Sequence, residues 1–512
     1  MLETCCFGKT NEVIAPKGFG YNKAIRTIIE EFRAICAIPH GSGFEKDIGE
    51  HLKKRLTSLG AEVHKDETGN ILGIIQGQEG REDVPAIILQ AHMDMVIAGD
   101  KKPEEAVVNP VIEEDSIKSD GHTTLGADNG IGLATILSLI KLKEKHYGPI
   151  KVLFTVSEEI GLKGAKAVPE SWLSGAKYMI NTDGFHSDTE VIGCKGGLRE
   201  TFSRQLQLEK IKDKVSFNTR KKNQLEETEL YEVKMEGFLG GHSGDDIDKH
   251  RCNSIHQLAE ILEEVQDRFD MRIVQFKGGV GYNAIPGDAT AIVAVPMACR
   301  LSAGKLLLKE EKHLHQEYER SDPTGRLTVK RLGETSKGSL IWNYDFQRDV
   351  LYFLTHLHDG ITSVDKEGEV TSSSNLGKVF TQDGFLYVGD MLRCDTIDQE
   401  NHILDMHRKT AGESGFELSV AGYHSWHSLS NSRLADTINE IYQEHHGVPM
   451  RKRVAKVGLE PAFFQELAPE MEIVCLGAEI LNAHSVKERV IISSIGVLYS
   501  LIAETLRRIW RA

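Results

Sequence analysis

One short stretch of the chain combines residue types that bind metal ions. A predicted strand of sequence AIILQ runs into Ala91, His92, Met93 and Asp94. Side chains two residues apart point to the same side of an extended chain, so Asp94 can approach the His92 ring. A carboxylate that holds a metal-bound imidazole is typical of zinc sites. Taken alone, however, the pattern is short, and a structural histidine explains it better.

Further potential ligands lie just after predicted strands or at a turn. Asp128 lies in the turn GADNG, where a helix begins. Glu158 and Glu159 directly follow the strand KVLFTV. Asp183 lies in NTDG and His484 in NAHS, each after a strand. Each also has a simple structural explanation, such as a helix N-cap for Asp128 and a solvated loop for the two glutamates.

Together these residues supply enough ligands for a pair of metal ions. Open α/β sheets place their sites at the carboxyl ends of the strands, so the side chains are expected to converge there. Two imidazoles and three carboxylates suit Zn, Mn or Co, whereas sets made only of oxygen suit Mg or Ca. One carboxylate remains for another role. The conjunction therefore predicts a site that holds two divalent metal ions.

The elements that must position these residues alternate along the first two hundred residues. Helices are predicted at 21–36, 45–59 and 131–142, and strands at 70–77, 84–90, 151–156 and 177–181. Such alternation predicts an α/β architecture with a mostly parallel central sheet flanked by helices.

The pattern changes after Gly193 and returns near residue 432. The segment 199–236 is charged and extended; beyond it, a helix is predicted near 250–270 and a smaller sheet from the runs 289–295 and 384–390. The last part predicts helices at 432–446 and 487–510 around a strand at 473–475. We therefore expect a catalytic domain in two pieces, 1–193 and 426–512, with a smaller α+β domain inserted at 194–425.

Composition excludes several classes of protein. The chain has 512 residues, more than one core usually holds, and a formal net charge of −15. Its basic runs at 220–222 and 451–453 are short, so no nucleic-acid partner is expected. No apolar stretch suits a membrane span, residues 1–18 lack an export signal, and eight scattered cysteines form no CxxC pair. We expect a cytoplasmic protein with no membrane partner.

The motifs as a set resemble one peptidase family. HMD, GADN, SEE, NTDG and NAHS occur in the order of the di-zinc peptidases that include carboxypeptidase G, tripeptidase T and the carnosinases. The inserted segment adds GGHSGDDID, then Arg251 and Asn253, then NAIP and Arg393. Within the family, the chain most resembles the bacterial aminoacyl-histidine dipeptidases, over nearly its whole length.

The resemblance implies a role for each predicted ligand. Asp128 would bridge the two ions, and the peptide bond after it would be cis. His92 and Asp183 would complete one site, and Glu159 and His484 the other. Glu158 would be the general base for a water shared by the two ions, with Asp94 as the partner of His92.

It also implies residues for substrate. In the inserted domain, which would act as a lid, His242 would stabilise the oxyanion, while Asn283 and Arg393 would bind substrate. Glu460 would anchor the substrate amine. The chain departs from the dipeptidase pattern beside Glu460, where it has KVGLEPA, and at Tyr423, where it has YHSW. These departures leave the substrate preference open.

The expected activity is metal-dependent hydrolysis of dipeptides, of the Xaa-His type such as β-alanyl-histidine or over a broad range. The metals would be Zn, or Mn or Co. An alternative within the family is an amidohydrolase of N-acyl amino acids, and a non-catalytic binding homologue is a third. A nucleotide-binding role for GGHSG has little support, because no P-loop or GxGxxG follows a strand. A homodimer through the inserted domain is also compatible with the resemblance.

Overall fold

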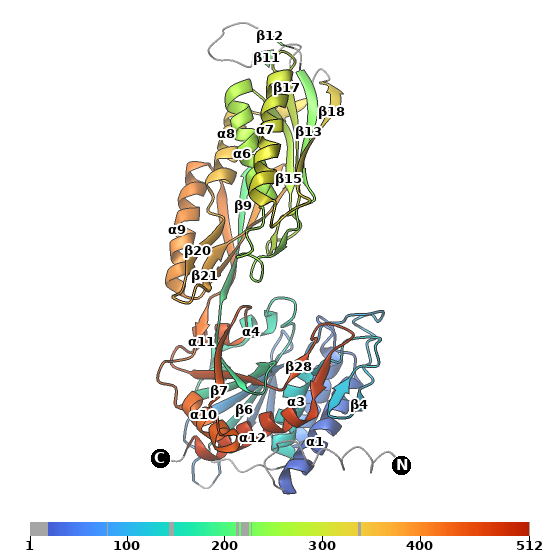
Figure 1. Ribbon diagram of the computed structural model, residues 1–512. Helices are drawn as coiled ribbons and strands as arrows, with labels where there is room; N and C mark the ends of the chain where they lie inside the picture. The colour runs from blue at the N-terminus through green and yellow to red at the C-terminus, as the bar shows by residue number, and fades with distance from the viewer. Residues whose placement is uncertain are drawn as a thin grey trace. The chain divides into compact units, whose positions relative to one another are not determined.

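The computed structural model describes residues 19–78, 80–142, 148–210, 215–216, 225–226, 228–335 and 339–510. The N-terminal segment 1–18 and the basic run at 220–222 lie outside these residues. The chain divides into two compact units (Figure 1). Unit 1 contains the chain up to Cys194 and again from Trp426 onward, and unit 2 is Lys195–Ser425.

Unit 1 is built on a nine-stranded sheet whose centre is parallel. The strand order is β1-β2-β6-β3-β7-β27-β8-β25, with β26 beside β8. β3 pairs in parallel with β6 and β7, and β7 pairs in parallel with β27. The outer strands β1 and β2 run antiparallel. The predicted mostly parallel sheet is confirmed for the strands that carry the candidate ligands.

The elements of unit 1 have the following bounds. Its helices are α1 (Phe19–Cys36), α2 (Lys46–Ser58), α3 (Ala127–Lys141), α4 (Lys163–Ala167), α5 (Glu170–Leu173), α10 (Arg433–His446), α11 (Pro461–Leu467) and α12 (Ile492–Arg508). The strands of the main sheet are β1 (Glu62–Lys65), β2 (Ile71–Ile75), β3 (Ala86–His92), β6 (Ile150–Thr155), β7 (Ala176–Gly184), β8 (Thr189–Cys194), β25 (Trp426–His427), β26 (Arg451–Ala455) and β27 (Glu472–Gly477). A small second sheet contains β4 (Val111–Glu113), β5 (Ser116–Lys118), β28 (Ile480–Leu481) and β29 (Arg489–Ile491).

Burial explains why these segments form these elements. Every residue of β3 is buried, because the strand has parallel neighbours on both edges and helices over the sheet. Helix α3 is mostly apolar after its first turn and is buried from Ala127 to Leu139. It packs against α1 and α12, which lie beside it in Figure 1. The predicted final helix at 487–510 begins only at Ile492, because β29 occupies the residues before it.

Unit 2 contains an antiparallel sheet of ten strands with helices against it. The strands are β9 (Gly196–Gln205), β13 (Thr228–Glu236), β15 (Arg272–Gly278), β17 (Ala289–Pro296), β18 (Arg326–Glu334), β20 (Gly360–Val364), β21 (Val370–Ser374), β22 (Leu376–Gln382), β23 (Phe385–Cys394) and β24 (Glu417–Tyr423). Its helices are α6 (Ser254–Phe269), α7 (Arg300–Tyr318), α8 (Tyr344–His356) and α9 (Ile397–Glu413). Two-stranded pairs join β10 (Leu208–Lys210) to β19 (Leu340–Trp342), β11 (Val215–Ser216) to β12 (Leu225–Glu226), and β14 (Gly241–His242) to β16 (Ala284–Ile285).

The sheet of unit 2 corrects one expectation. A smaller sheet was predicted from two alternating runs, but the sheet has ten strands, against nine in unit 1. Several of its strands, such as β18 and β24, are largely solvent-exposed, so they lack the apolar alternation that marks a half-buried strand. The α+β class itself is confirmed.

Two further expectations concern composition. The six cysteines within the described residues are all free thiols. Across the same residues, no helix combines the length and the apolar character that a membrane span needs.

A fully buried cluster of ionisable groups lies in unit 2. Glu200 on β9 and Asp390 on β23 are directly opposite in register, and both are completely buried. His407 on α9 lies 2.6 Å from a Glu200 oxygen through Nδ1, and its Nε2 is 3.1 Å from the His358 carbonyl. Both oxygens of Asp390 lie within 2.9 Å of the Ser374 hydroxyl. Burial, with the nearby Glu200 carboxylate, raises the pKa of Asp390 well above its usual range, although His407 opposes the shift.

Asp390→Asn is expected to make the unfolding of unit 2 less sensitive to pH. Because the folded state holds the proton of Asp390 more tightly than the unfolded state, the free energy of unfolding is highest below the ordinary carboxyl pKa. It falls as the pH rises through the raised pKa of the folded state. Asparagine cannot ionise and can still contact Ser374. At about pH 8 the variant should therefore melt roughly 2–4 °C above the parent, which corresponds to a gain of about 1 kcal/mol in the free energy of unfolding. Thermal unfolding between about pH 5 and pH 9 measures this.

The exposed Asp383 in the neighbouring β22–β23 turn gives the control Asp383→Asn. It should leave the pH profile unchanged. A melting temperature of Asp390→Asn that changes with pH in parallel with that of the parent would show that ionisation of Asp390 does not affect stability in this range.

Candidate metal centre

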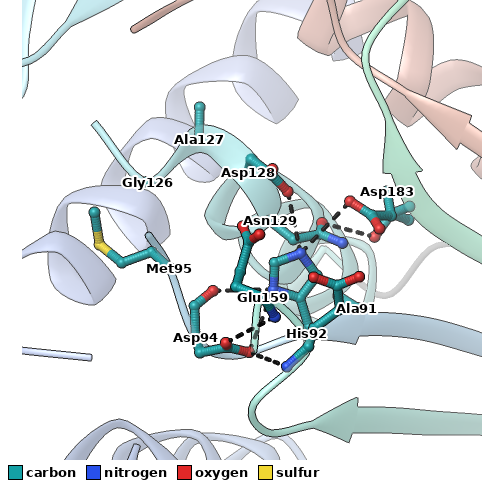
Figure 2. Close-up of polar contacts among 12 residues, drawn as sticks. Ala91, His92, Asp94, Met95, Gly126, Ala127, Asp128, Asn129, Glu159 and Asp183 are labelled. Carbon is teal, nitrogen blue, oxygen red and sulfur yellow. Dashed lines mark hydrogen bonds and ion pairs between the residues drawn. The ribbon is translucent and has the colours of Figure 1, made fainter. Parts of the chain in front are cut away.

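Three of the predicted ligands form a buried group at the carboxyl end of the central strands. His92 ends β3, Asp128 lies in the first turn of α3, and Asp183 lies near the end of β7. The Nε2 atom of His92 is 3.1 Å from Asp128 Oδ1 and 3.5 Å from Asp183 Oδ1. Figure 2 shows both carboxylates facing the imidazole ring. The group has the composition of a metal site.

A second group shares Asp128 with the first. The Nε2 atom of His484, in the loop after β28, is 3.1 Å from Asp128 Oδ2 and 3.0 Å from Glu159 Oε1. Asp128 thus offers a different oxygen to each histidine. Donor atoms around one tetrahedral zinc ion, at about 2.0–2.1 Å from it, lie roughly 3.3 Å apart. The spacing in both groups therefore fits a cation.

The electrostatics of the two groups also fit bound cations. Burial opposes a charge on His92, but Asp128 and Asp183 outweigh it and raise the pKa of the ring well above its usual value. Hydrogen bonds to the carboxylates of Asp128 and Glu159 raise the pKa of His484 to about 10. The carboxylates therefore favour positive charge at both histidines. Metal binding requires neutral imidazole, so a cation would take the place of each proton.

Glu158 lies beside these groups without being part of either shared set. One of its carboxylate oxygens lies within 4.8 Å of ligand atoms of His92 and Glu159. Burial raises the pKa of Glu158 well above its usual range, and the Asp183 and Glu159 carboxylates add to this effect. A carboxylate that resists losing its proton, beside a candidate metal centre, has the properties of a general acid–base group.

Asp94 has more partners than the sequence suggested. Its carboxylate is 3.6 Å from His92 Nδ1, whereas its own carbonyl oxygen is nearer, at 2.9 Å. The carboxylate accepts the backbone N–H groups of Glu158 and Glu159, at 2.9 and 3.2 Å, and the Ser42 hydroxyl. Asp94 therefore orients the loop of both glutamates as well as lying beside the imidazole.

The start of α3 rules out the simplest explanation of Asp128. The residue at the N-cap of the helix is Gly126, in the left-handed region at φ 68°, and it has no side chain that could cap the helix. A side chain at Gly126 would meet the Met95 sulfur at 2.8 Å. The carboxylate of Asp128 instead points to His92 and His484. The peptide bond between Asp128 and Asn129 is cis, as the resemblance predicted.

Glu460 lies in unit 1 and is fully enclosed. Its Oε2 atom accepts from Gln90 Nε2 at 2.5 Å and from the Thr155 hydroxyl at 2.9 Å. The other oxygen has no hydrogen-bond partner among the described residues. Burial raises the pKa of this carboxyl to about 7. One oxygen of Glu460 therefore remains able to accept a hydrogen bond.

Unit 2 brings together the three residues predicted to act on substrate. Arg393 Nη2 lies 3.4 Å from His242 Nε2, and Arg393 Nε donates to the Ser243 hydroxyl at 3.2 Å. The Ser243 N–H donates to the Asn283 carbonyl at 2.9 Å, beside the β14–β16 pair. A guanidinium, an imidazole and an exposed amide thus share one end of unit 2.

Two positioning residues have no signal in the sequence. Glu45, just before α2, accepts the N–H and the hydroxyl of Ser157, both at 2.9 Å, and so holds the loop before Glu158. Glu488 accepts four backbone N–H groups around Asp128. Both are isolated glutamates in charged stretches, and only the tertiary contacts distinguish them.

Most of the chain matches a known family. The sequence profile of Peptidase family M20/M25/M40 matches residues 88–508. The chain belongs to this peptidase family. It is therefore a hydrolase that acts on peptide bonds, and the family resemblance inferred from the motifs is confirmed.

Individual relatives match nearly the whole chain. The cytosol non-specific dipeptidase of Escherichia coli (strain K12) is 30% identical over 490 residues, which cover 93% of this chain and 96% of the relative. The crystal structure of the aminoacylhistidine dipeptidase from Vibrio alginolyticus has a TM-score of 0.77 at 27% identity and covers 94% of this chain and 96% of that one. A tripeptidase from Staphylococcus aureus, at a TM-score of 0.54 and 17% identity, shares the fold alone.

Proposed function

We propose that this chain is a metal-dependent dipeptidase that works with two divalent cations. One observation carries the proposal: the two oxygens of Asp128 face two different histidines, each with a further carboxylate. His92 and Asp183 would hold one ion, and Glu159 and His484 the other. The donor set suits Zn, with Mn or Co as alternatives. The E. coli and Vibrio relatives, both dipeptidases, support the reaction class.

The residues of the chain divide the work of hydrolysis between them. When bound, the cations supply Lewis-acid chemistry that activates water and stabilises negative charge. Glu158 would take a proton from the attacking water and deliver it to the leaving nitrogen, a role worth roughly 10²- to 10⁴-fold in rate. Asp94 and Glu45 hold the loop of Glu158 through its backbone.

Unit 2 would act as the lid that binds substrate. His242 would donate a hydrogen bond to the oxyanion, and its imidazole lies beside the guanidinium of Arg393. Arg393 would bind the substrate carboxylate, for which its planar fork is suited, and Asn283 would contribute an amide. Glu460, with one free oxygen, would anchor the substrate amine.

We also propose a cytoplasmic location, a short peptide as partner and a homodimer through unit 2.

A second candidate function has one observation in its favour. Glu460 is fully enclosed and already accepts hydrogen bonds from Gln90 and Thr155. If it stays enclosed during turnover, it cannot reach an amine. The substrate would then need no free amine, as for an amidohydrolase of N-acyl amino acids.

A panel of substrates separates the two functions. It contains β-alanyl-histidine, an ordinary dipeptide, the N-acetyl form of that dipeptide and the matching tripeptide, each with Zn, Mn and Co. A tripeptide extends about 3.5 Å beyond a dipeptide and cannot keep both end contacts. We expect kcat/KM for the dipeptides to exceed kcat/KM for the N-acetyl form and for the tripeptide by at least about tenfold. This factor corresponds to about 1.4 kcal/mol in transition-state binding. Histidine at the C-terminal position should be accepted.

Glu460→Gln serves as the matched variant for this panel. It should reduce the preference for the free amine while leaving the metal content unchanged. Equal kcat/KM for the dipeptide and its acetylated form in the parent chain would instead favour the amidohydrolase.

A further inference from the structure

Glu488 holds an unusual set of hydrogen bonds next to the candidate metal centre. Its Oε2 atom accepts the N–H groups of Leu125 and Gly126 at 2.9 and 3.1 Å. Its Oε1 atom accepts those of Ala127 and Asp128 at 2.9 and 3.3 Å. The side chain is buried, and these four N–H groups belong to consecutive residues.

The shape of this backbone explains why it binds a carboxylate. Successive N–H groups around a left-handed residue form a concave nest that binds anions. Gly126 supplies the left-handed residue, and the N-terminus of α3 follows it directly. Here the anion comes from the same chain, 360 residues away from Asp128.

The loop of Glu488 also carries His484. The N–H of Glu488 donates to the Ser485 carbonyl at 3.0 Å, so the two residues form one turn just after the histidine. His484 has a positive φ of 61° and Asn482 one of 55°, so the chain around the histidine makes tight left-handed turns. The His484 side chain is 48% exposed, so packing alone does not fix it.

We infer that Glu488 is a positioning residue that sets the separation of Asp128 and His484 and thereby the affinity of the metal site that they share. The carboxylate joins the backbone of one ligand to the loop of the other. Both of its oxygens accept backbone N–H groups, so it would act on the metal site through these two ligands. The inference rests on the proposed function, because it concerns the same pair of cations.

The four contacts predict how substitutions at Glu488 behave. Glutamine keeps the length of the side chain, but its amide group turns N–H donors toward two backbone N–H groups, so half of the nest loses its acceptor. Aspartate keeps the charge but is one methylene shorter, so it cannot reach all four groups at once. Both variants should loosen the loop of His484 relative to Asp128.

The experiment measures metal binding directly, without activity. The metal-free chain is titrated with Zn, Mn or Co by calorimetry, and the absorption spectrum of the Co form reports the ligands. For Glu488→Gln and Glu488→Asp, we expect the dissociation constant of one ion to rise about 10- to 100-fold, as for other residues that orient ligands. A large excess of the metal should restore kcat, because the catalytic groups are intact.

Glu479→Gln provides the control, because Glu479 lies just before β28 and contacts His186. It should bind both ions like the parent. Glu488 variants that lose thermal stability but bind both ions like the parent would overturn the inference while leaving the proposed function in place. If Glu488→Gln does not fold, Glu488→Asp decides the question alone. A parent chain that binds no metal would instead remove the proposed function.

Discussion

Glu158→Gln is expected to lower kcat by roughly 10²- to 10⁴-fold while the chain keeps both metal ions. The reason is its position. Glu158 lies beside both candidate groups, but neither of the two groups that share Asp128 includes it. Glutamine has the same shape but cannot take a proton from water. Steady-state kinetics of the purified variant measure kcat, and elemental analysis measures its metal content.

The adjacent glutamate is the matched control. Glu159 Oε1 lies 3.0 Å from His484 Nε2, so Glu159→Gln removes a ligand. It should lose one ion as well as activity, and added metal should recover part of the activity. Identical metal titrations for the two variants would show that the roles of base and ligand are wrongly assigned.

Asp128→Asn is expected to have the largest effect on metal content. Because Asp128 offers one oxygen to each histidine, its loss weakens both sites at once. An amide supplies only one oxygen and carries no charge, so it cannot serve two cations. We expect the number of ions per chain to fall from two towards zero, and hydrolysis of a dipeptide to fall below detection.

Asp183→Asn is the control for Asp128→Asn, because Asp183 would bind one ion and Asp128 would bind both. Of the two histidines, Asp183 lies beside His92, at 3.5 Å, so this variant should lose one ion and keep the other. If Asp128→Asn and Asp183→Asn lose the same number of ions, Asp128 does not bridge the sites.

The sequence predicts those parts of the candidate site in which a residue that can bind a metal ion lies at the end of a strand. His92 and Asp183 lie at the ends of β3 and β7, and Glu158 and Glu159 lie in the loop after β6. These three strands lie together in the parallel centre of the sheet. Parallel strands bring their carboxyl ends to one edge, so residues far apart in sequence converge there. The helix N-cap explanation of Asp128 fails only in three dimensions, because Gly126 occupies the cap position.

Long-range contacts could not be predicted in the same way. The hydrogen bonds of Glu45 and Glu488 join segments separated by 112 and by about 360 residues, and no local pattern marks either glutamate. The pattern is also weak in the charged helix α7 and in the exposed strands of unit 2. Much of their surface faces solvent, so they lack apolar periodicity. Propensity and pattern report local burial, whereas these features depend on partners distant in the chain.

The most direct test of the account is the metal content of the purified chain. Elemental analysis of protein prepared without chelator, then incubated with Zn, Mn or Co, should give two ions per chain, with a rise in melting temperature on binding. Both candidate groups are then occupied, and the shared position of Asp128 is explained. A chain that holds no ion, and gains no thermal stability from any of the three metals, would contradict the two-cation centre.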